Sequence, residues 1–219
     1  MQRYIEWILR YRFVVIALTL IVTIAAVIQA KNLNIIIDPN TMLPQSHPYV
    51  TTSNLVEKVF GSKYVVMVGV TPKEGDIYQP MILEKIQRMT AAFLQTPGVV
   101  KENLLSLSSK RAKNIAGTAE GLEVKPLMSK VPATAAQLTE LREAVGKNPV
   151  YLNSIVSVDA KTTAILVEFK DGPGGFRAIM DKVEAVVGHE RDSRVEINVG
   201  GIPSFLARIE IYSERIGFL

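Results

Sequence analysis

FVVIALTLIVTIAAVIQA, residues 13–30, is a run of eighteen residues without a charged side chain, bounded by Arg12 and Lys31. At about 1.5 Å per residue, a helix of this length covers roughly 27 Å, close to the hydrocarbon thickness of a bilayer. The hydroxyls of Thr19 and Thr23 can bond to backbone carbonyls four residues earlier, so they do not disqualify the run. The stretch predicts a transmembrane helix over residues 13–30.

Cationic and aromatic side chains precede this predicted helix. Residues 1–12 contain Arg3, Arg10 and Arg12 among Tyr, Trp, Ile and Leu residues, which suits a segment at the membrane surface. Because basic residues stay on the cytoplasmic side, we expect a cytoplasmic N-terminus and an extracytoplasmic remainder. A secretory signal peptide is the alternative, although the apolar run exceeds the ~7–15 residues of a signal core.

The charge of the chain is concentrated at its N-terminal end. Of 219 residues, 48% are hydrophobic and 21% charged, cysteine is absent, and the net charge is +4. Residues 1–30 hold three arginines and one glutamate, which leaves 22 basic and 20 acidic residues in the other 189. This nearly neutral remainder argues against nucleic-acid binding, and the composition argues against disordered or disulfide-stapled classes.

The outer segment reads as an α+β domain built from two strand–helix–strand units. A proline-containing connector over residues 31–48 leads into it, because prolines 39, 44 and 48 forbid a regular element there. The period of apolar residues then predicts, in order, a helix over 49–60, a strand over 64–70, a helix over 77–95 with the stripe Ile82, Ile86, Met89 and Phe93, and a strand over 99–107. The second unit comprises a strand over 163–169, a helix with Phe176, Ile179, Met180, Val183 and Val187 on one face, and a strand with Val195, Ile197 and Val199 on one face.

Two such units predict a ferredoxin-like (split βαβ) domain over residues 49–201, with an antiparallel sheet and two helices on one face. An insertion over about 108–160 separates them. Its first part, residues 108–133, is polar and is expected to be an irregular, mobile loop, followed by a helix that a capping box of Thr134 and Gln137 begins and Gly146 ends.

The last residues, 202–219, are expected to return to the membrane. Phe205, Ile209, Tyr212 and Ile216 form an apolar stripe at helical spacing, and the sequence stops at Leu219 without a polar tail. We expect a second transmembrane helix beyond Leu219.

In the order of these features the chain resembles the first half-repeat of the resistance-nodulation-division (RND) superfamily of exporters, in the hydrophobe and lipid branch related to the MMPL group. The resemblance covers nearly the whole chain. Besides the single early span, it rests on the connector motifs Asp38-Pro39, Leu43-Pro44 and Pro48, on Phe60-Gly61, on Pro97-Gly98-Val99 and on Gly200-Gly201-Ile202-Pro203.

The resemblance implies the first periplasmic, porter-type domain and membrane anchor of a proton-driven exporter in the bacterial cytoplasmic (inner) membrane. Its partners would be the lipid bilayer, a hydrophobic or lipid-like substrate and the remaining transmembrane repeats of the same polypeptide; association into a homo-oligomer is left open. The proton-relay residues of the family lie on later spans, and residues 13–30 contain no ionisable side chain. A singly anchored extracytoplasmic binding or assembly domain is the main alternative, and a membrane-anchored hydrolase ranks far below both.

No catalytic, cofactor-binding or metal-binding constellation emerges from the sequence, so we predict that the protein is not an enzyme. Its two histidines, His47 and His189, are 142 positions apart and suit solvated or helix-capping roles. Gly172-Pro173-Gly174-Gly175 precedes a helix, but no Lys-Ser or Lys-Thr pair follows, so we interpret it as a turn rather than a phosphate loop. The carboxylates Glu140, Glu143, Asp181 and Glu184 all lie on predicted polar faces.

Methionines give the only hint of a path for an apolar ligand. Met67, Met89 and Met180 are expected to fill the core, whereas Met42 and Met128 lie in predicted irregular stretches and are candidates for such a path. The identity of any substrate is not encoded in these patterns, and no residue is assigned to its binding.

Overall fold

The computed structural model describes residues 10–30, 43–60, 64–118, 121–170 and 174–217. Its helices are α2 (Arg12–Ala30), α3 (Pro48–Phe60), α4 (Pro80–Gln95), α5 (Ala135–Gly146), α6 (Gly175–Val187) and α7 (Ile202–Gly217), with a short 3₁₀ turn, η1 (Gly188–Glu190). Its strands are β1 (Val65–Pro72), β2 (Lys113–Thr118), β3 (Gly121–Pro126), β4 (Thr163–Glu168) and β5 (Val195–Gly201). The chain is thus a mixed α+β protein, and it divides into two compact units, residues 1–36 and 37–219.

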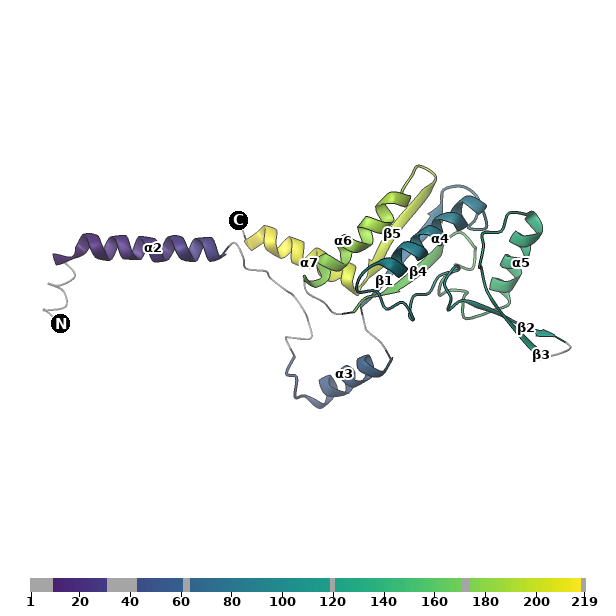
Figure 1. Ribbon diagram of the computed structural model, residues 1–219, viewed down its shortest axis with the longest axis horizontal. Coiled ribbons are helices and arrows are strands. Elements are labelled where there is room, and N and C mark those ends of the chain that lie inside the picture. The colour runs from purple at the N-terminus through teal and green to yellow at the C-terminus, as the bar shows by residue number, and fades with distance from the viewer. Residues whose placement is uncertain (1–9, 31–42, 61–63, 119–120, 171–173, 218–219) are drawn as a thin grey trace. The chain divides into compact units, whose positions relative to one another are not determined.

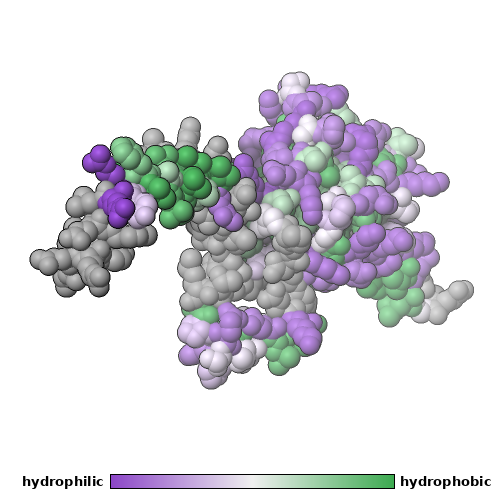
Figure 2. All heavy atoms as spheres, turned by 60° about the vertical axis from the view of Figure 1, so that its left-hand side comes forward, coloured by the Kyte–Doolittle hydropathy of each residue, from purple (hydrophilic) through white to green (hydrophobic). Residues whose placement is uncertain are grey.

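The first unit contains α2, which forms where the sequence predicts a transmembrane helix. Its apolar side chains are exposed and make the green surface of this helix in Figure 2. Thr19 Oγ1 donates to the carbonyl of Val15 and Thr23 Oγ1 to that of Thr19, both at 2.8 Å, so the two hydroxyls are satisfied within the helix. By length and composition alone α2 can cross a membrane, a criterion that a signal sequence also meets.

A three-stranded antiparallel sheet organises the second unit. Its order is β4-β1-β5, with β1 in the centre (Figure 1). Val66, Val68 and Val70 alternate along β1, so they share one face, and all three are fully buried. Helices α4 and α6 cover one face of the sheet (Figure 1). The predicted strand over 64–70 is therefore the central strand, and its continuous run of valines reflects burial between two neighbouring strands and a helical layer.

The two covering helices bury the stripes that the sequence predicts. Ile82, Ile86, Met89 and Phe93 of α4 are buried, as are Phe176, Ile179, Val183 and Val187 of α6. Side chains spaced three and four residues apart lie on one helical face, so each helix turns a continuous apolar surface to the sheet.

The strand predicted over residues 99–107 does not form as a regular strand. Val99 and Leu105 make isolated antiparallel bridges to Phe169 and to Leu166 of β4, and the residues between them turn away. The reason is the polar sequence Lys101-Glu102-Asn103, which interrupts the apolar residues on which the prediction of a strand relied. Hydrogen bonds between the backbones of Leu105 and Leu166, at 3.0 and 2.8 Å, still hold the segment against the outer edge of β4.

The prediction of an irregular loop over residues 108–133 is wrong in its middle part, where β2 and β3 form a hairpin. Ile115 pairs with Val124 and Gly117 with Leu122, so the apolar side chains share one face of the hairpin. Ile115, Leu122 and Val124 are all exposed. The period-two alternation of Leu122, Val124 and the intervening Glu123 was the signal for a strand, and interspersed lysines and glycines obscured it.

Helix α5 begins with the predicted capping box. The backbone N–H of Gln137 donates to Thr134 Oγ1 at 3.3 Å, and Gln137 Oε1 accepts from the backbone N–H of Thr134, also at 3.3 Å. Replacing Thr134 by alanine should lower the free energy of unfolding by about 1 kcal/mol, because one N-terminal N–H loses its partner. Urea unfolding of the detergent-solubilised chain measures this difference. The control is Thr139→Ala, a substitution at an exposed position of the same helix, which should not destabilise the protein. Equal losses of unfolding free energy in the two variants would contradict the assignment of Thr134 as the cap.

Helix α7 forms over the predicted residues, but the side that it buries is not the apolar stripe. Leu206, Ala207 and Glu210 face the domain and are buried, whereas Phe205 and Tyr212 are exposed. Ile209 is half-buried, and the side chain of Ile216 lies outside the described residues. The helix therefore presents an apolar outer surface in addition to the side packed on α6.

Candidate functional site

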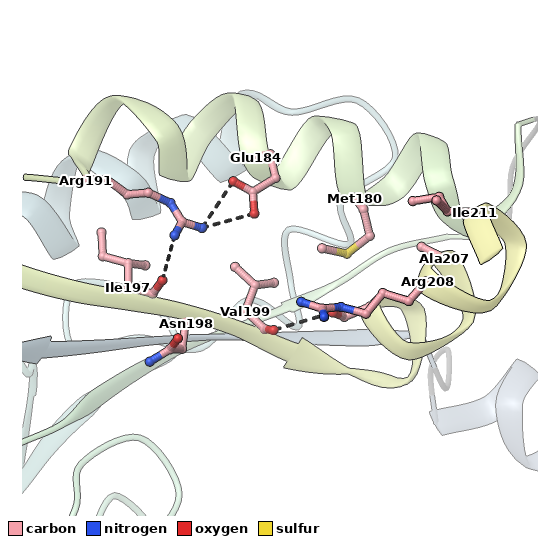
Figure 3. A pocket seen from close by; sticks show the side chains of 10 residues that line it. Met180, Glu184, Arg191, Ile197, Asn198, Val199, Ala207, Arg208 and Ile211 are labelled. Atoms are coloured by element: carbon pink, nitrogen blue, oxygen red, sulfur yellow. Dashed lines mark hydrogen bonds and ion pairs between the residues drawn. The ribbon is translucent and has the colours of Figure 1, made fainter. Parts of the chain in front are cut away.

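A groove lies between β5, α6 and α7 and holds a volume of about 280 Å³ (Figure 3). It is lined by Met180 and Glu184 of α6, by Arg191, by Ile197, Asn198 and Val199 of β5, and by Ser204, Ala207, Arg208 and Ile211 of α7. The four residues from α7 recur at intervals of three, one and three, so they lie on one face of that helix. Met180, Val199, Ala207 and Ile211 supply an apolar lining.

Polar contacts close the groove along the edge of β5. Arg191 donates to both carboxylate oxygens of Glu184, at 3.1 and 3.2 Å, and to the backbone carbonyl of Ile197 at 3.1 Å. Ser204 Oγ donates to the carbonyl of Val199 at 3.4 Å. The dashed lines in Figure 3 follow these contacts, which tie α6 and α7 to the outer edge of the sheet.

Arg208, unlike Arg191, forms no ion pair within the described part of the chain. Its side chain is exposed, one helical turn from the apolar side chain of Ile211 on one side and from Ser204 on the other. Arg191, by contrast, is already neutralised by Glu184. The arrangement can accept a short apolar segment whose anionic end lies at Arg208, because a guanidinium offers planar paired donors to a carboxylate or phosphate.

A buried carboxylate joins α7 to the start of α6. Glu210 Oε2 accepts from the backbone N–H of Arg177 at 3.2 Å, and Glu210 Oε1 is buried and has no hydrogen-bond partner among the described residues. Gly174 and Gly175 have φ values of 98° and 64°, and a side chain on Gly175 would lie 3.1 Å from Glu210 Oε1. The glycine pair thus makes room for the chain's own carboxylate, which agrees with its interpretation as a turn; Gly172 and Pro173 lie outside the described residues.

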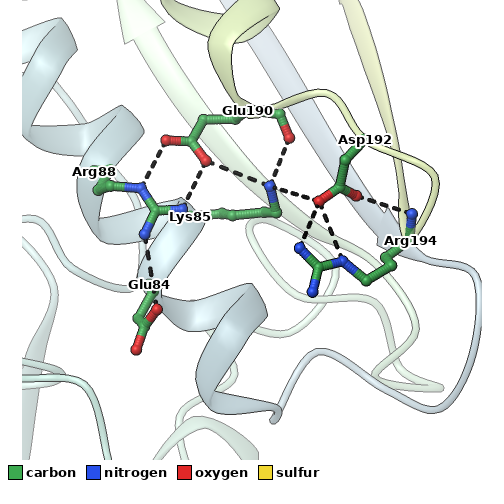
Figure 4. A network of polar contacts seen from close by, with 6 residues as sticks. All are labelled: Glu84, Lys85, Arg88, Glu190, Asp192 and Arg194. Atoms are coloured by element: carbon green, nitrogen blue, oxygen red, sulfur yellow. Dashed lines mark hydrogen bonds and ion pairs between the residues drawn. The ribbon is translucent and has the colours of Figure 1, made fainter.

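A second polar cluster connects α4 to the turn before β5 (Figure 4). The buried Lys85 Nζ donates to the backbone carbonyl of Glu190 at 2.7 Å and lies 3.2 Å from Asp192 Oδ2. Arg88 donates to both carboxylate oxygens of Glu190 at 2.8 Å, and Arg194 binds Asp192 through its backbone N–H and its guanidinium. Every charge in the cluster has an opposite partner, so its role is structural.

The carboxylates of this cluster are held in their ionised form. Hydrogen bonds from Arg88 keep the pKa of Glu190 below its usual range despite partial burial. Hydrogen bonds from the backbone and side chain of Arg194, with Lys85 nearby, depress the pKa of Asp192 strongly. A carboxylate with a lowered pKa in the folded state contributes stability above its unfolded pKa, near 4, and loses that contribution as pH falls towards the folded value.

We therefore expect the free energy of unfolding to be steady above about pH 5 and to fall below about pH 4.5. Urea titrations across this range measure the slope. Glu190→Gln should lower stability at pH 7 and flatten the acid slope, because that carboxylate no longer takes up a proton on unfolding. Glu102→Gln, an exposed carboxylate outside the cluster, should leave the slope unchanged; an unaltered slope in Glu190→Gln would refute the linkage.

The histidines and surface carboxylates lie apart from the groove, with the exception of Glu184. His47 is exposed, and its Nδ1 accepts from the backbone N–H of Tyr49 at 3.2 Å at the start of α3; His189 is exposed in η1. Glu140, Glu143, Asp181 and Glu184 are exposed, as their polar faces predict. The described residues contain no group of three or more His, Asp or Glu side chains that could hold a metal ion.

The methionines are placed differently from the sequence interpretation. Met128, a candidate for an apolar ligand path, is buried in the core, and Met67, expected in the core, is exposed on the uncovered face of β1. Met89 fills the core as predicted, Met180 lines the groove, and Met42 lies outside the described residues. Met128 is buried because parts of the chain that are distant in sequence pack around residues 127–128, and the polarity of its sequence neighbours does not indicate such packing.

The sequence did not single out Arg191, Arg208 or Ile211 of the groove. Ser204, Ala207, Arg208 and Ile211 share a helical face, and that spacing could have marked one wall. Arg191 had no local signal, because its partners come from α6 and β5.

No protein-family model matches this chain, and a search of curated proteins finds no match. The resemblance to RND exporters therefore rests on the order of the sequence motifs alone.

Proposed function

We propose that the chain is the membrane anchor and first extracytoplasmic domain of a proton-driven RND-type exporter of hydrophobic or lipid-like molecules, located in the bacterial inner membrane. The observation that carries the proposal is the groove between β5, α6 and α7, whose apolar lining ends at Arg208, in a chain that begins with a membrane-compatible helix. The other transmembrane repeats would belong to the same polypeptide and would move the domain.

The order of elements supports the split βαβ arrangement of such a domain. β1, α4 and the segment bridging to β4 form one strand–helix–strand succession, and β4, α6 and β5 form the second. Both helices cover one face of the sheet, and β1 lies between β4 and β5 (Figure 1). Residues 108–160, with β2, β3 and α5, are inserted between the two successions.

The dimensions of the groove suit part of an alkyl chain rather than a whole lipid. A volume of about 280 Å³ is at the lower end of small-molecule sites, which hold ligands mainly through apolar contact and a few polar groups. An acyl segment beside Met180 and Ile211 with its anionic group at Arg208 would use both kinds of contact.

A photoactivatable long-chain fatty acid tests this proposal on the full chain in lipid nanodiscs. Peptide-resolved mass spectrometry separates cross-links at groove residues from those at α2. Ile211→Glu should reduce groove cross-links about tenfold, a loss of ~1.4 kcal/mol, because it removes an apolar contact and places a negative charge one helical turn from Arg208, where it competes with the anionic group of the probe. Arg208→Glu should reduce them as well for an anionic probe.

Lys161→Glu, a charge change at an exposed turn outside the groove, is the matched control and should leave the cross-links unchanged. Circular dichroism establishes that each variant is folded. Groove cross-links that are absent from the unmodified chain, or that persist in Ile211→Glu, would overturn the binding proposal. A coding sequence that carries no further apolar spans after Leu219 would overturn the exporter assignment.

The hairpin of β2 and β3 favours a second candidate, a singly anchored binding or assembly domain. A two-stranded hairpin is at best marginally stable alone, yet Ile115, Leu122 and Val124 expose one of its faces. In an assembly domain this face would contact another subunit. Leu122→Lys should then abolish association in cross-linking experiments, and the groove should retain no fatty acid.

A further inference from the structure

We propose that the outer stripe of α7, formed by Ile202, Phe205, Ile209 and Tyr212, lies in the interface of the lipid bilayer. Ile202, Phe205 and Tyr212 are exposed to 53%, 64% and 59%, and Ile209 is half-buried. The residues recur at intervals of three, four and three, so they form one continuous line along the helix. The proposal rests on the membrane anchoring by α2 in the proposed function and does not depend on transport.

The domain holds α7 firmly with the stripe turned outwards. Leu206, Ala207 and Glu210 bury the opposite side, and Glu210 binds the backbone N–H of Arg177 at the start of α6. The exposed stripe is therefore a fixed surface feature and not an unfolded end. Large exposed apolar surfaces of this kind mark contacts with proteins or membranes.

Strand β1 begins at the end of the sheet where β5 ends and α7 begins. Val66, near the start of β1, pairs with Gly201, which immediately precedes α7. The residues that link α2 to β1, numbers 31–64, therefore lead to the point where α7 begins. Through these residues the chain connects the end of the sheet at which α7 begins to α2, the helix that is long and apolar enough to cross a membrane.

The size and chemistry of the stripe favour lipid over a second copy of the chain. Side chains of these types expose on the order of 400 Å² together, whereas a stable protein interface needs roughly 800 Å² from each partner. Phe205 and Tyr212 are residues that suit the headgroup boundary, and Arg208 beside them can extend its guanidinium to lipid phosphates. A narrow apolar stripe with a flanking cation is sufficient for an interfacial helix, because the span already provides the anchor.

Nitroxide labels at single cysteines test this directly, because the natural chain contains no cysteine. The variants Phe205→Cys and Tyr212→Cys are labelled in the full chain in zwitterionic phosphatidylcholine vesicles, together with Leu20→Cys in α2 and Lys161→Cys at an exposed turn. Collision rates with oxygen, which concentrates in lipid, and with a water-soluble nickel chelate give the depth of each label.

We expect the labels at residues 205 and 212 to favour oxygen several-fold more than the label at 161, at a shallower depth than the label at 20. Labels at 205 and 212 that match the label at 161 would overturn the proposal, as would labels inaccessible to both reagents, which would indicate a covering protein surface. Lipid exposure at 20 without lipid exposure at 205 and 212 refutes this inference alone. Water exposure at 20 refutes the anchor in the proposed function and this inference with it.

Discussion

Replacing Gly201 by alanine should lower the free energy of unfolding by about 3 kcal/mol or more, one of the two largest losses that we expect. Gly201 has a φ of 107°, a conformation that residues with a Cβ rarely adopt. A methyl group at this position would overlap the backbone carbonyl oxygen of Val65 in the neighbouring strand. The strain and the overlap add, because neither β1 nor the β5–α7 junction can move without breaking the pairing of Val66 with Gly201.

Gly200→Ala provides a matched control one residue away. A Cβ at Gly200 meets no atom within 4 Å, and its φ lies outside the left-handed region. Alanine there should change stability by less than about 1 kcal/mol. Urea unfolding followed by circular dichroism measures both variants, and hydrogen exchange of the β1 amides reports the same difference if Gly201→Ala is too unstable for titration. Similar losses in the two variants would show that the junction does not need glycine at 201.

Replacing Lys85 by methionine should cost about 3 kcal/mol, because it removes the ammonium group that bridges Glu190 and Asp192 while preserving the apolar stem. The Lys85 side chain is only 6% exposed, and its Nζ also holds the backbone carbonyl of Glu190. The variant leaves that carbonyl without its side-chain donor and removes the buried cation from Glu190 and Asp192, which keep only Arg88 and Arg194 as partners. Removing one partner of a buried charge cluster is far more costly than replacing the whole cluster by apolar groups.

Lys147→Met tests whether burial sets this cost. Lys147 forms an ion pair with Glu143 at 3.0 Å, but both side chains are largely exposed on α5. Its loss should change the free energy of unfolding by less than about 0.5 kcal/mol. A comparable loss from Lys147→Met, or a loss below about 1 kcal/mol from Lys85→Met, would contradict the structural role of the cluster.

The sequence predicted the main elements because each of them is amphipathic or apolar throughout. A run of apolar residues that includes Val66, Val68 and Val70 predicted a central strand. The apolar stripes of α4 and α6 predicted helices, and these helices cover the sheet. Such patterns arise because one side of each element faces the core, and the spacing of apolar residues within the element shows which side that is. The order of the elements then restricted the fold to an antiparallel sheet with helices on one face.

The sequence could not show what depends on partners far apart in the chain. No local pattern marks Lys85 as buried, because its partners Glu190 and Asp192 lie more than 100 positions later in the chain. Arg191 belongs to the groove only because α6 and β5 converge there. Met128 is buried by the tertiary fold although its neighbours are polar and irregular. In each case the decisive contact is long-range, and no spacing within the sequence encodes it.

The side chains along the edge of β5 also determine whether this strand can pair with a strand of a neighbouring molecule. An outer strand with open carbonyls can pair with a strand of another molecule and begin aggregation. Here the carbonyls of Ile197 and Val199 are occupied by Arg191 and Ser204. A strand of another molecule would therefore find two of its hydrogen-bond acceptors already taken, and the apolar groove beside β5 is protected against edge-to-edge pairing.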